Sequence, residues 1–242
     1  MCTLTILPES KDGLRFSAMM NRDELNERQK ALPPLLRDGI LAPRDADAGG
    51  TWTAINESGL IGFVLNRTEE GDRLNSGSVS RGSILPALLE APSVKDASGL
   101  WHRIPLHDMR PFYCLLRDRQ EQRLFSFNGE ALTHRLMDIA SPLLLATSGL
   151  GDSLVHPYRE SLFARLLSHH PDRETQRQFH HHHDPRHPAQ SVMMMRDDAR
   201  TVSITSYNVQ VSTASIDYFD IDGSTVRAQL RLRNAKESLY AS

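Results

Sequence analysis

The feature that most limits the fold is a predicted β-strand that is apolar on both faces. Residues 14–20 (LRFSAMM) carry apolar side chains at successive positions, where a strand with one solvated face would alternate. A strand of this kind needs cover on both sides of its sheet. Two stacked sheets with helices outside them, a four-layer αββα sandwich, would satisfy that need, whereas periodicity alone indicates the α+β class.

Turn signals and periodicity locate the other elements. The turn-rich segment 8–13 contains Asp-Gly, a strong hairpin signal, between the strand that ends at Pro8 and the strand at 14–20. Residues 32–50 are predicted as a loop, and residues 171–190, which are polar and histidine-rich, as a flexible surface loop. Helical spacing favours helices over 80–91, 93–104 and 157–170. Further strands are predicted at 51–56, 60–66, 112–118, 123–129, 143–149, 199–209, 213–221 and 225–233.

Size and charge exclude several classes of protein. The chain has 242 residues and no internal repeat, so we expect a single domain over 1–242. A net charge of −2 without a basic stripe argues against nucleic acid as a partner. No apolar run is long enough for a membrane span, and the N-terminus lacks the pattern of a secretory signal. Cys2 and Cys114 make no disulfide framework, which favours a cytoplasmic location.

Cys2 is the residue with the most distinctive chemistry. The initiator methionine is normally removed before a small residue, which would leave Cys2 with a thiol and a free α-amine. That amine has a pKa of roughly 7.7–8.0, so it could accept the thiol proton without a separate histidine. A cysteine near a terminus is, however, more often a small buried residue at the start of a strand.

The neighbouring residues favour the functional interpretation. If the first hairpin closes around residues 10–13, Cys2 lies opposite residues 19–23, beside Arg22 and Asp23. Arg22 could lower the pKa of the thiol or hold a substrate carbonyl, and Asp23 could pair with the α-ammonium. Asn66, at the end of a buried strand, could donate a hydrogen bond to an oxyanion, although strand-end asparagines are common.

Five segments resemble one family. MCTL at the start, NRDE at 21–24, GGTW at 49–52, GL..G..LN at 59–66 and SRG at 80–82 are similar to the NRDE family, also called the transport and Golgi organization 2 family. The resemblance implies the fold of the N-terminal-nucleophile hydrolases, close to the penicillin V acylase and bile salt hydrolase group.

The same resemblance implies roles for individual residues. Cys2 matches the nucleophile, Arg22 and Asp23 the arginine and aspartate after the first hairpin, and Asn66 the early oxyanion asparagine. Arg200 resembles a late arginine of those acylases. Their second asparagine has no counterpart here, because Thr147 and Ser148 occupy that place. Candidate substrate-binding residues are Asn21, Trp52 and Ser148, with Trp52 equally suited to core packing.

Two other signals are weaker. The tract His180–His183, with His187, is histidine-rich but lacks the fixed ligand spacing of a zinc site, so we expect no functional metal site. Cys114 lies in a predicted buried strand and is interpreted as a core residue rather than a second nucleophile.

These features favour an amidohydrolase or acyltransferase that acts on non-peptide carbon–nitrogen bonds of a small-molecule substrate. No cofactor is expected. The alternative is a non-catalytic carrier for a hydrophobic ligand such as haem or an acyl group. The sequence does not specify the oligomeric state.

Overall fold

The structure is a computed structural model that describes residues 2–69, 71–167 and 171–233, and within them two antiparallel sheets. The first sheet contains, in spatial order, β10 (Leu143–Ala146), β1 (Cys2–Pro8), β2 (Phe16–Leu25), β11 (Ala199–Val209), β12 (Thr213–Asp220) and β13 (Thr225–Arg231). The second contains β3 (Leu32–Arg37), β4 (Ile40–Arg44), β5 (Thr53–Asn56), β6 (Ile61–Asn66), β7 (Phe112–Arg117), β8 (Gln122–Phe127) and β9 (Leu132–Met137).

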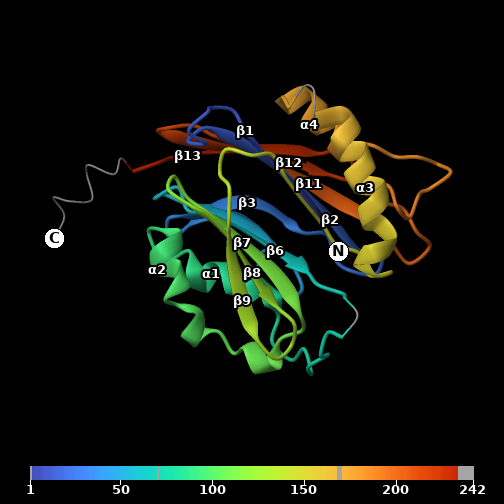
Figure 1. The fold of residues 1–242 in the computed structure, drawn as a ribbon, viewed down its shortest axis with the longest axis horizontal. Helices are drawn as coiled ribbons and strands as arrows, with labels where there is room; N and C mark the ends of the chain where they lie inside the picture. Colours follow the sequence, from blue (N-terminus) through green and yellow to red (C-terminus); the bar gives the residue numbers. More distant parts are fainter. Residues whose placement is uncertain (1, 70, 168–170, 234–242) are drawn as a thin grey trace.

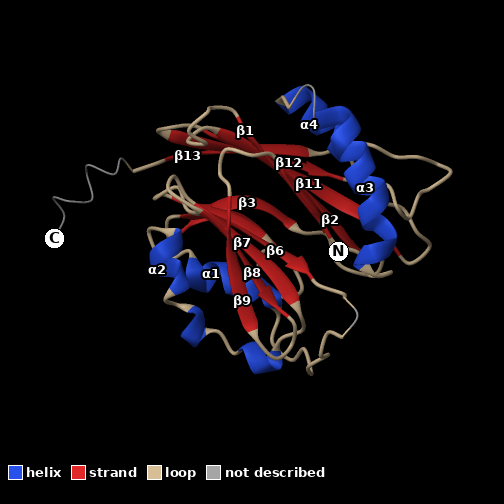
Figure 2. Cartoon of the chain, viewed as in Figure 1, coloured by secondary structure: helices blue, strands red, loops and turns tan. Residues whose placement is uncertain are grey.

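Helices cover the outer faces of the two sheets (Figures 1 and 2). Helices α3 (Asp152–Leu167) and α4 (Arg173–His180) pack on the first sheet, and α1 (Ile84–Leu88) and α2 (Val94–Ser98) pack on the second. The main core lies between the sheets, where side chains such as Leu4 and Phe63 are fully buried. The predicted four-layer αββα sandwich is confirmed.

Both faces of strand β1 are buried, each against a different layer of the fold. Leu4 and Ile6 point into the core between the sheets, whereas Leu7 packs against α3 and α4 on the opposite face. Thr3 and Thr5 also face the helices, since their hydroxyls bond Arg159 of α3 and His180 of α4. The outer face of this strand is therefore partly polar but fully buried, which matters for the site at its first residue.

The predicted first hairpin is confirmed. Its turn contains Gly13 at φ +70°, in the left-handed region that favours glycine, and a Cβ there would lie 2.7 Å from the carbonyl oxygen of Ile139. The buried Arg117 guanidinium donates to the Gly13 carbonyl oxygen at 2.7 Å and lies 4.0 Å from the centre of the Phe16 ring. This contact joins the turn to β7 of the second sheet.

Two predicted loops are wrong in part. Residues 32–50 contain β3 and β4, and Pro33 and Pro34 are accommodated because β3 is the edge of its sheet. Residues 171–190 contain helix α4, which begins with a capping box: Asp172 accepts from the Thr175 amide at 2.8 Å, and the Thr175 side chain accepts from the Asp172 amide. The end of the predicted helix 157–170, residues 168–170, lies outside the described residues.

Candidate functional site

Cys2 is the first residue of β1 and pairs with Arg22 of β2, as the hairpin geometry predicts. Its side chain belongs to the core between the sheets and is 6% exposed. Because Cys2 stands at the end of the strand, the core opens there into a pocket of about 130 Å³. The predicted site residues that line this pocket are Cys2, Arg22, Asp23, Trp52 and Asn66.

Ion pairs and an aromatic ring fix Arg22. Its guanidinium lies 4.5 Å from the centre of the Trp52 ring and donates to Asp45 Oδ2 at 2.5 Å and to Glu24 Oε2 at 3.1 Å. Burial alone would raise the pKa of Asp45, but the Ala48 amide and the nearby guanidinium groups, Arg22 among them, outweigh it and lower that pKa. A cation is thereby fixed beside the thiol.

The resting thiol is held in its neutral form. Burial raises the pKa of Cys2 and outweighs the positive charges of the N-terminal amine and Arg22, which lower it, while the negative charge of Asp23 raises it further. The thiol is therefore protonated at neutral pH. A nucleophilic reaction at this sulfur consequently needs a base that removes the proton during the reaction, rather than a thiolate that exists beforehand.

Asp23 is buried behind the thiol, on the side of the sheet that faces the helices. Its Oδ1 accepts a hydrogen bond from the Thr201 hydroxyl at 2.6 Å. Burial raises the pKa of Asp23, and the positive charge of Arg159 opposes that change. Arg159 is 1% exposed and donates to the Thr3 hydroxyl at 2.7 Å and to the Ser191 carbonyl at 2.9 Å. Arg159 was not predicted as a site residue, because helical spacing assigns residue 159 to a helix without indicating what its side chain contacts.

Thr147, rather than Ser148, touches Cys2. The Cys2 amide donates to Thr147 Oγ1 at 3.2 Å, and the Thr147 amide donates to the Cys2 carbonyl at 2.9 Å. Ser148 accepts from the Leu150 amide at 3.1 Å, in the turn that leads to α3, and does not line the pocket. Thr147 therefore fixes the backbone of Cys2, whereas the Ser148 side chain has a local role in the turn.

The GGTW and SRG segments meet at the wall of the pocket. The Thr51 amide donates to the Gly82 carbonyl at 3.0 Å. A Cβ on Gly50 would lie 2.6 Å from Gly82 Cα, so the two backbones touch where neither residue can carry a side chain. Arg81 lines the pocket beside them and donates to the Pro111 carbonyl at 3.0 Å. Burial lowers the pKa of Arg81.

Asn21 lies outside the pocket, on the helix side of β2. Its amide donates to the carbonyl oxygens of His180 and Val192 at 2.9 and 3.0 Å, and its Oδ1 lies 2.5 Å from His180 Nδ1. The His180 Nε2 lies 2.7 Å from the Thr5 hydroxyl. Since Asn21 Oδ1 can only accept, Nδ1 carries the proton and Nε2 accepts from Thr5. Asn21 thus anchors the end of α4, and the first histidine of the tract is a core residue.

Arg200 also lies outside the pocket. In the register of β11 on β2 it lies opposite Glu24. It is exposed and lines a neighbouring hollow of about 180 Å³. The structure therefore places it near the candidate site but not beside the thiol.

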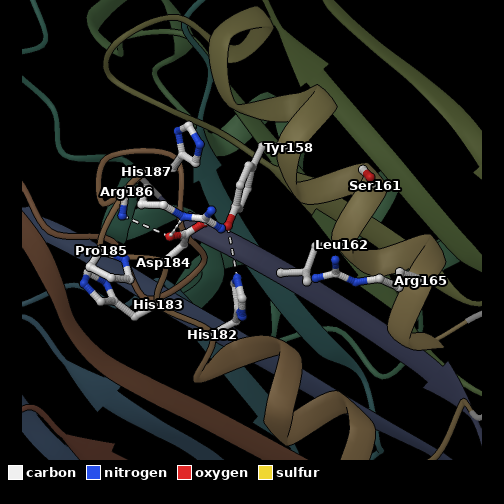
Figure 3. Close-up of a pocket in the computed structure, with 10 residues that line it drawn as sticks. All are labelled: Tyr158, Ser161, Leu162, Arg165, His182, His183, Asp184, Pro185, Arg186 and His187. Atoms are coloured by element: carbon white, nitrogen blue, oxygen red, sulfur yellow. Dashed lines mark hydrogen bonds and ion pairs between the residues drawn. The ribbon is translucent and has the colours of Figure 1, made fainter.

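His182, His183 and His187 line a different hollow, of about 510 Å³, between α3 and the segment that follows α4 (Figure 3). Here Tyr158 and His182 are hydrogen-bonded at 3.0 Å, and Arg186 pairs with Asp184. Among the described residues, no group of three or more His, Cys, Asp or Glu side chains could hold a metal ion. Cys114 is fully buried in β7, as predicted, and burial raises the pKa of its thiol.

Sequence comparison decides the family. The family model described as Transport and Golgi organisation 2 matches residues 1–225. The chain belongs to that family. No curated protein sequence matches it significantly. Within the described part of this family member, no helix combines the length and hydropathy that a membrane crossing needs.

Solved structures confirm the fold. An N-acylethanolamine-hydrolyzing acid amidase ortholog from Caenorhabditis elegans superposes with a TM-score of 0.60 at 11% identity, over 85% of this chain and 92% of that one. A conjugated bile acid hydrolase from Clostridium perfringens matches in two altered forms, with TM-scores of 0.50 and 0.54 and identities of 13% and 11%. These matches cover 94% of this chain and 96% and 92% of theirs. The family member therefore has the N-terminal-nucleophile hydrolase fold; at these identities the likeness shows the fold alone.

Proposed function

We propose that this protein is an amidohydrolase or acyltransferase that acts on non-peptide carbon–nitrogen bonds, with Cys2 as the N-terminal nucleophile. The observation that carries the proposal is the pocket at the start of β1, where Cys2, Arg22, Asp23 and Asn66 come together from three strands. The fold supports it, because the structural neighbours named above are hydrolases.

The proposed reaction begins with removal of Met1, which gives Cys2 a free α-amine. The thiol of Cys2 is buried and neutral, so a base is needed, and an α-amine with a pKa of roughly 7.7–8.0 is suited to that task at neutral pH. As the sulfur attacks the substrate carbonyl carbon, the amine takes the thiol proton. It passes that proton to the substrate nitrogen as the carbon–nitrogen bond breaks, which leaves an acyl thioester on Cys2. Water or a second amine then attacks the thioester and restores the thiol.

The surrounding groups have separate parts in this scheme. Asp23 orients the α-ammonium, and Thr147, whose hydroxyl lies 3.2 Å from the Cys2 nitrogen, holds that nitrogen in place. Asn66 lines the pocket from the end of β6 and donates to the oxyanion. Arg22, whose guanidinium lies over the Trp52 ring, binds the substrate at its carbonyl group. The positive charge of Arg159 opposes the rise in the pKa of Asp23 that burial causes.

A non-catalytic carrier is the second candidate. It is favoured by the resemblance to the acylases: we align Thr147 and Ser148 with their second asparagine, and neither residue has an amide side chain. A carrier would use the same pocket to bind a hydrophobic ligand, and substitution of Cys2 would leave that binding intact.

Reaction with an aryl ester of a medium-chain fatty acid tests the proposal. We expect one acyl group on Cys2 and none on Cys114, which is fully buried and serves as an internal control. Cys2→Ala should abolish both the adduct and product release, and Cys2→Ser should retain slow reaction. Equal, slow labelling of the two cysteines would reject an activated thiol. Two results together would favour the carrier: the wild type is never acylated, and the Cys2→Ala variant still binds the fatty acid.

A further inference from the structure

A second hollow lies beside the pocket at Cys2. The hollow of about 180 Å³ shares Arg22, Glu24 and Arg28 with the Cys2 pocket, so the same side chains of β2 and the segment after it line both spaces. Buried Tyr218 lines it together with apolar side chains such as Val202 and Ile221. A ring of charged side chains surrounds this apolar lining.

Arg200 is the exception among the cations of that ring. Arg22 pairs with Glu24 at 3.1 Å, and Arg28 pairs with Asp45 at 2.7 Å. Lys30 pairs with Asp222 and with Asp220. Among the residues that the structure describes, the Arg200 side chain has no hydrogen bond or ion pair, although it lines the hollow and lies opposite Glu24 in the strand register.

The order of events indicates which half of a substrate would occupy this hollow. After the carbon–nitrogen bond breaks, the acyl half stays on Cys2 while the amine half must leave before water enters. The Cys2 pocket is walled by buried residues such as Asp23 and Trp52. The second hollow is bordered by exposed side chains, with Lys30 55% and Asp222 53% exposed. The amine half therefore fits the second hollow.

We propose that this hollow binds the departing amine half of the substrate and that Arg200 pairs with a carboxylate on it. The inference rests on the proposed function, because it assigns the leaving group of that reaction. The Arg200 guanidinium, which makes no ion pair among the described residues, offers two parallel N–H donors that match a carboxylate, and the apolar lining accommodates the carbon atoms between the carboxylate and the scissile bond.

Two matched probes test this assignment: 4-(octanoyloxy)benzoate and its neutral carboxamide. They carry the same acyl group, and their phenol leaving groups, which stand in for the amine, are similar in size and differ in charge. Each rate is divided by the rate of uncatalysed hydrolysis, which corrects for the different acidity of the two phenols. In wild type we expect the second-order rate constant for acylation to favour the anionic ester by about tenfold. That ratio should fall towards one in Arg200→Gln and be largely retained in Arg200→Lys. Arg231→Gln, which removes an exposed arginine of β13 outside both spaces, should keep the wild-type ratio.

The outcomes separate the two proposals. An unchanged ratio in Arg200→Gln, or no preference in wild type, would overturn the assignment of Arg200 while leaving Cys2 as nucleophile. Failure of both esters to acylate Cys2 would count against the proposed function. Calorimetry then measures the equilibrium binding of 4-hydroxybenzoate to wild type and to Arg200→Gln. This measurement tests carboxylate binding in the hollow without requiring acylation of Cys2. Binding that weakens in the variant supports the inference, and no binding to wild type overturns it.

Discussion

Replacing His180 by glutamine should remove an acid-sensitive part of the protein's stability. The imidazole is fully buried between Asn21 and Thr5, and burial lowers its pKa from 6.5 to about 3. Between pH 6.5 and about 3, His180 is therefore protonated in the unfolded chain and neutral in the folded protein. Because the folded pKa lies below the unfolded one, the stabilisation is fully present above pH 6.5 and is lost as the pH falls towards 3.

The size of the effect follows from those two pKa values. Between them, each pH unit costs about 1.4 kcal/mol of unfolding free energy. At pH 5 the unfolded histidine is almost fully protonated and the folded one is not, so the loss relative to pH 7 is about 2 kcal/mol. A proton on Nε2 would have to be donated to Thr5, whose hydroxyl already accepts from Gln176 at 2.9 Å and would lose the acceptor of its own proton.

Urea unfolding at pH 7, 6 and 5 measures this directly. His180→Gln should be less stable than wild type at pH 7, and the gap should shrink by about 2 kcal/mol at pH 5. His107→Gln, whose parent side chain is 82% exposed, is the matched control and should run parallel to wild type. If His180→Gln does not fold, an NMR titration of the wild-type ring replaces it, with no titration expected down to pH 5. Parallel curves for His180→Gln and wild type, or a ring that titrates near 6.5, would refute the reasoning.

Further predictions concern the wall and the rear of the pocket. Gly50→Ala places a methyl group 2.6 Å from Gly82 Cα, so it should cost about 1–3 kcal/mol of unfolding free energy and slow the acylation of Cys2. Gly99→Ala, whose Cβ approaches only a carbonyl oxygen at 3.3 Å, is the control, and equal stability of the two variants would contradict the close contact. Arg159→Met removes the buried cation near Asp23 and should cost about 3–5 kcal/mol in urea unfolding. Adding Asp23→Asn should recover part of that loss, and strictly additive effects would show that the two charges do not interact.

Much of the fold follows from local sequence signals. The Asp-Gly turn fixes the first hairpin, and with it the pairing of Cys2 with Arg22. The strands predicted at 199–209, 213–221 and 225–233 correspond closely to β11, β12 and β13. These segments have regular patterns because each is bounded by turns and packs along its whole length in the first sheet.

Other elements depended on context that periodicity does not record. Pro33 and Pro34 indicate a loop until β3 is known to be an edge strand. Helix α4 is polar along most of its length and buries only Gln176, Phe179 and His180, so its composition predicted a loop although its capping box gave a start signal. The histidine tract that begins at the end of α4 was interpreted as part of a surface loop, yet its first member, His180, is a core residue.

The first hairpin predicted Arg22 and Asp23 beside Cys2, and Trp52 and Asn66 of distant segments were also predicted, whereas Arg159 was missed. Arg22 and Asp23 follow from strand register alone. Arg159 belongs to α3 and Thr147 directly follows β10, and both lie more than 140 residues from Cys2 along the chain. The packing of α3 on the first sheet brings Arg159 there, and the antiparallel pairing of β10 with β1 brings Thr147. Arg200, near the start of β11, was also predicted as a site residue. Its side chain lines the neighbouring hollow and not the Cys2 pocket.

The most direct test of the central claim compares acylation of Cys2 when its α-amine is free and when it is blocked. The two forms are the processed protein and the same protein with Met1 retained, each verified by intact mass and exposed to the same aryl ester. If the α-amine is the base for the buried thiol, blocking it should slow thioester formation by about 100-fold or more. Equal rates in the two forms would contradict the account, since the thiol would then be activated by another group or not at all.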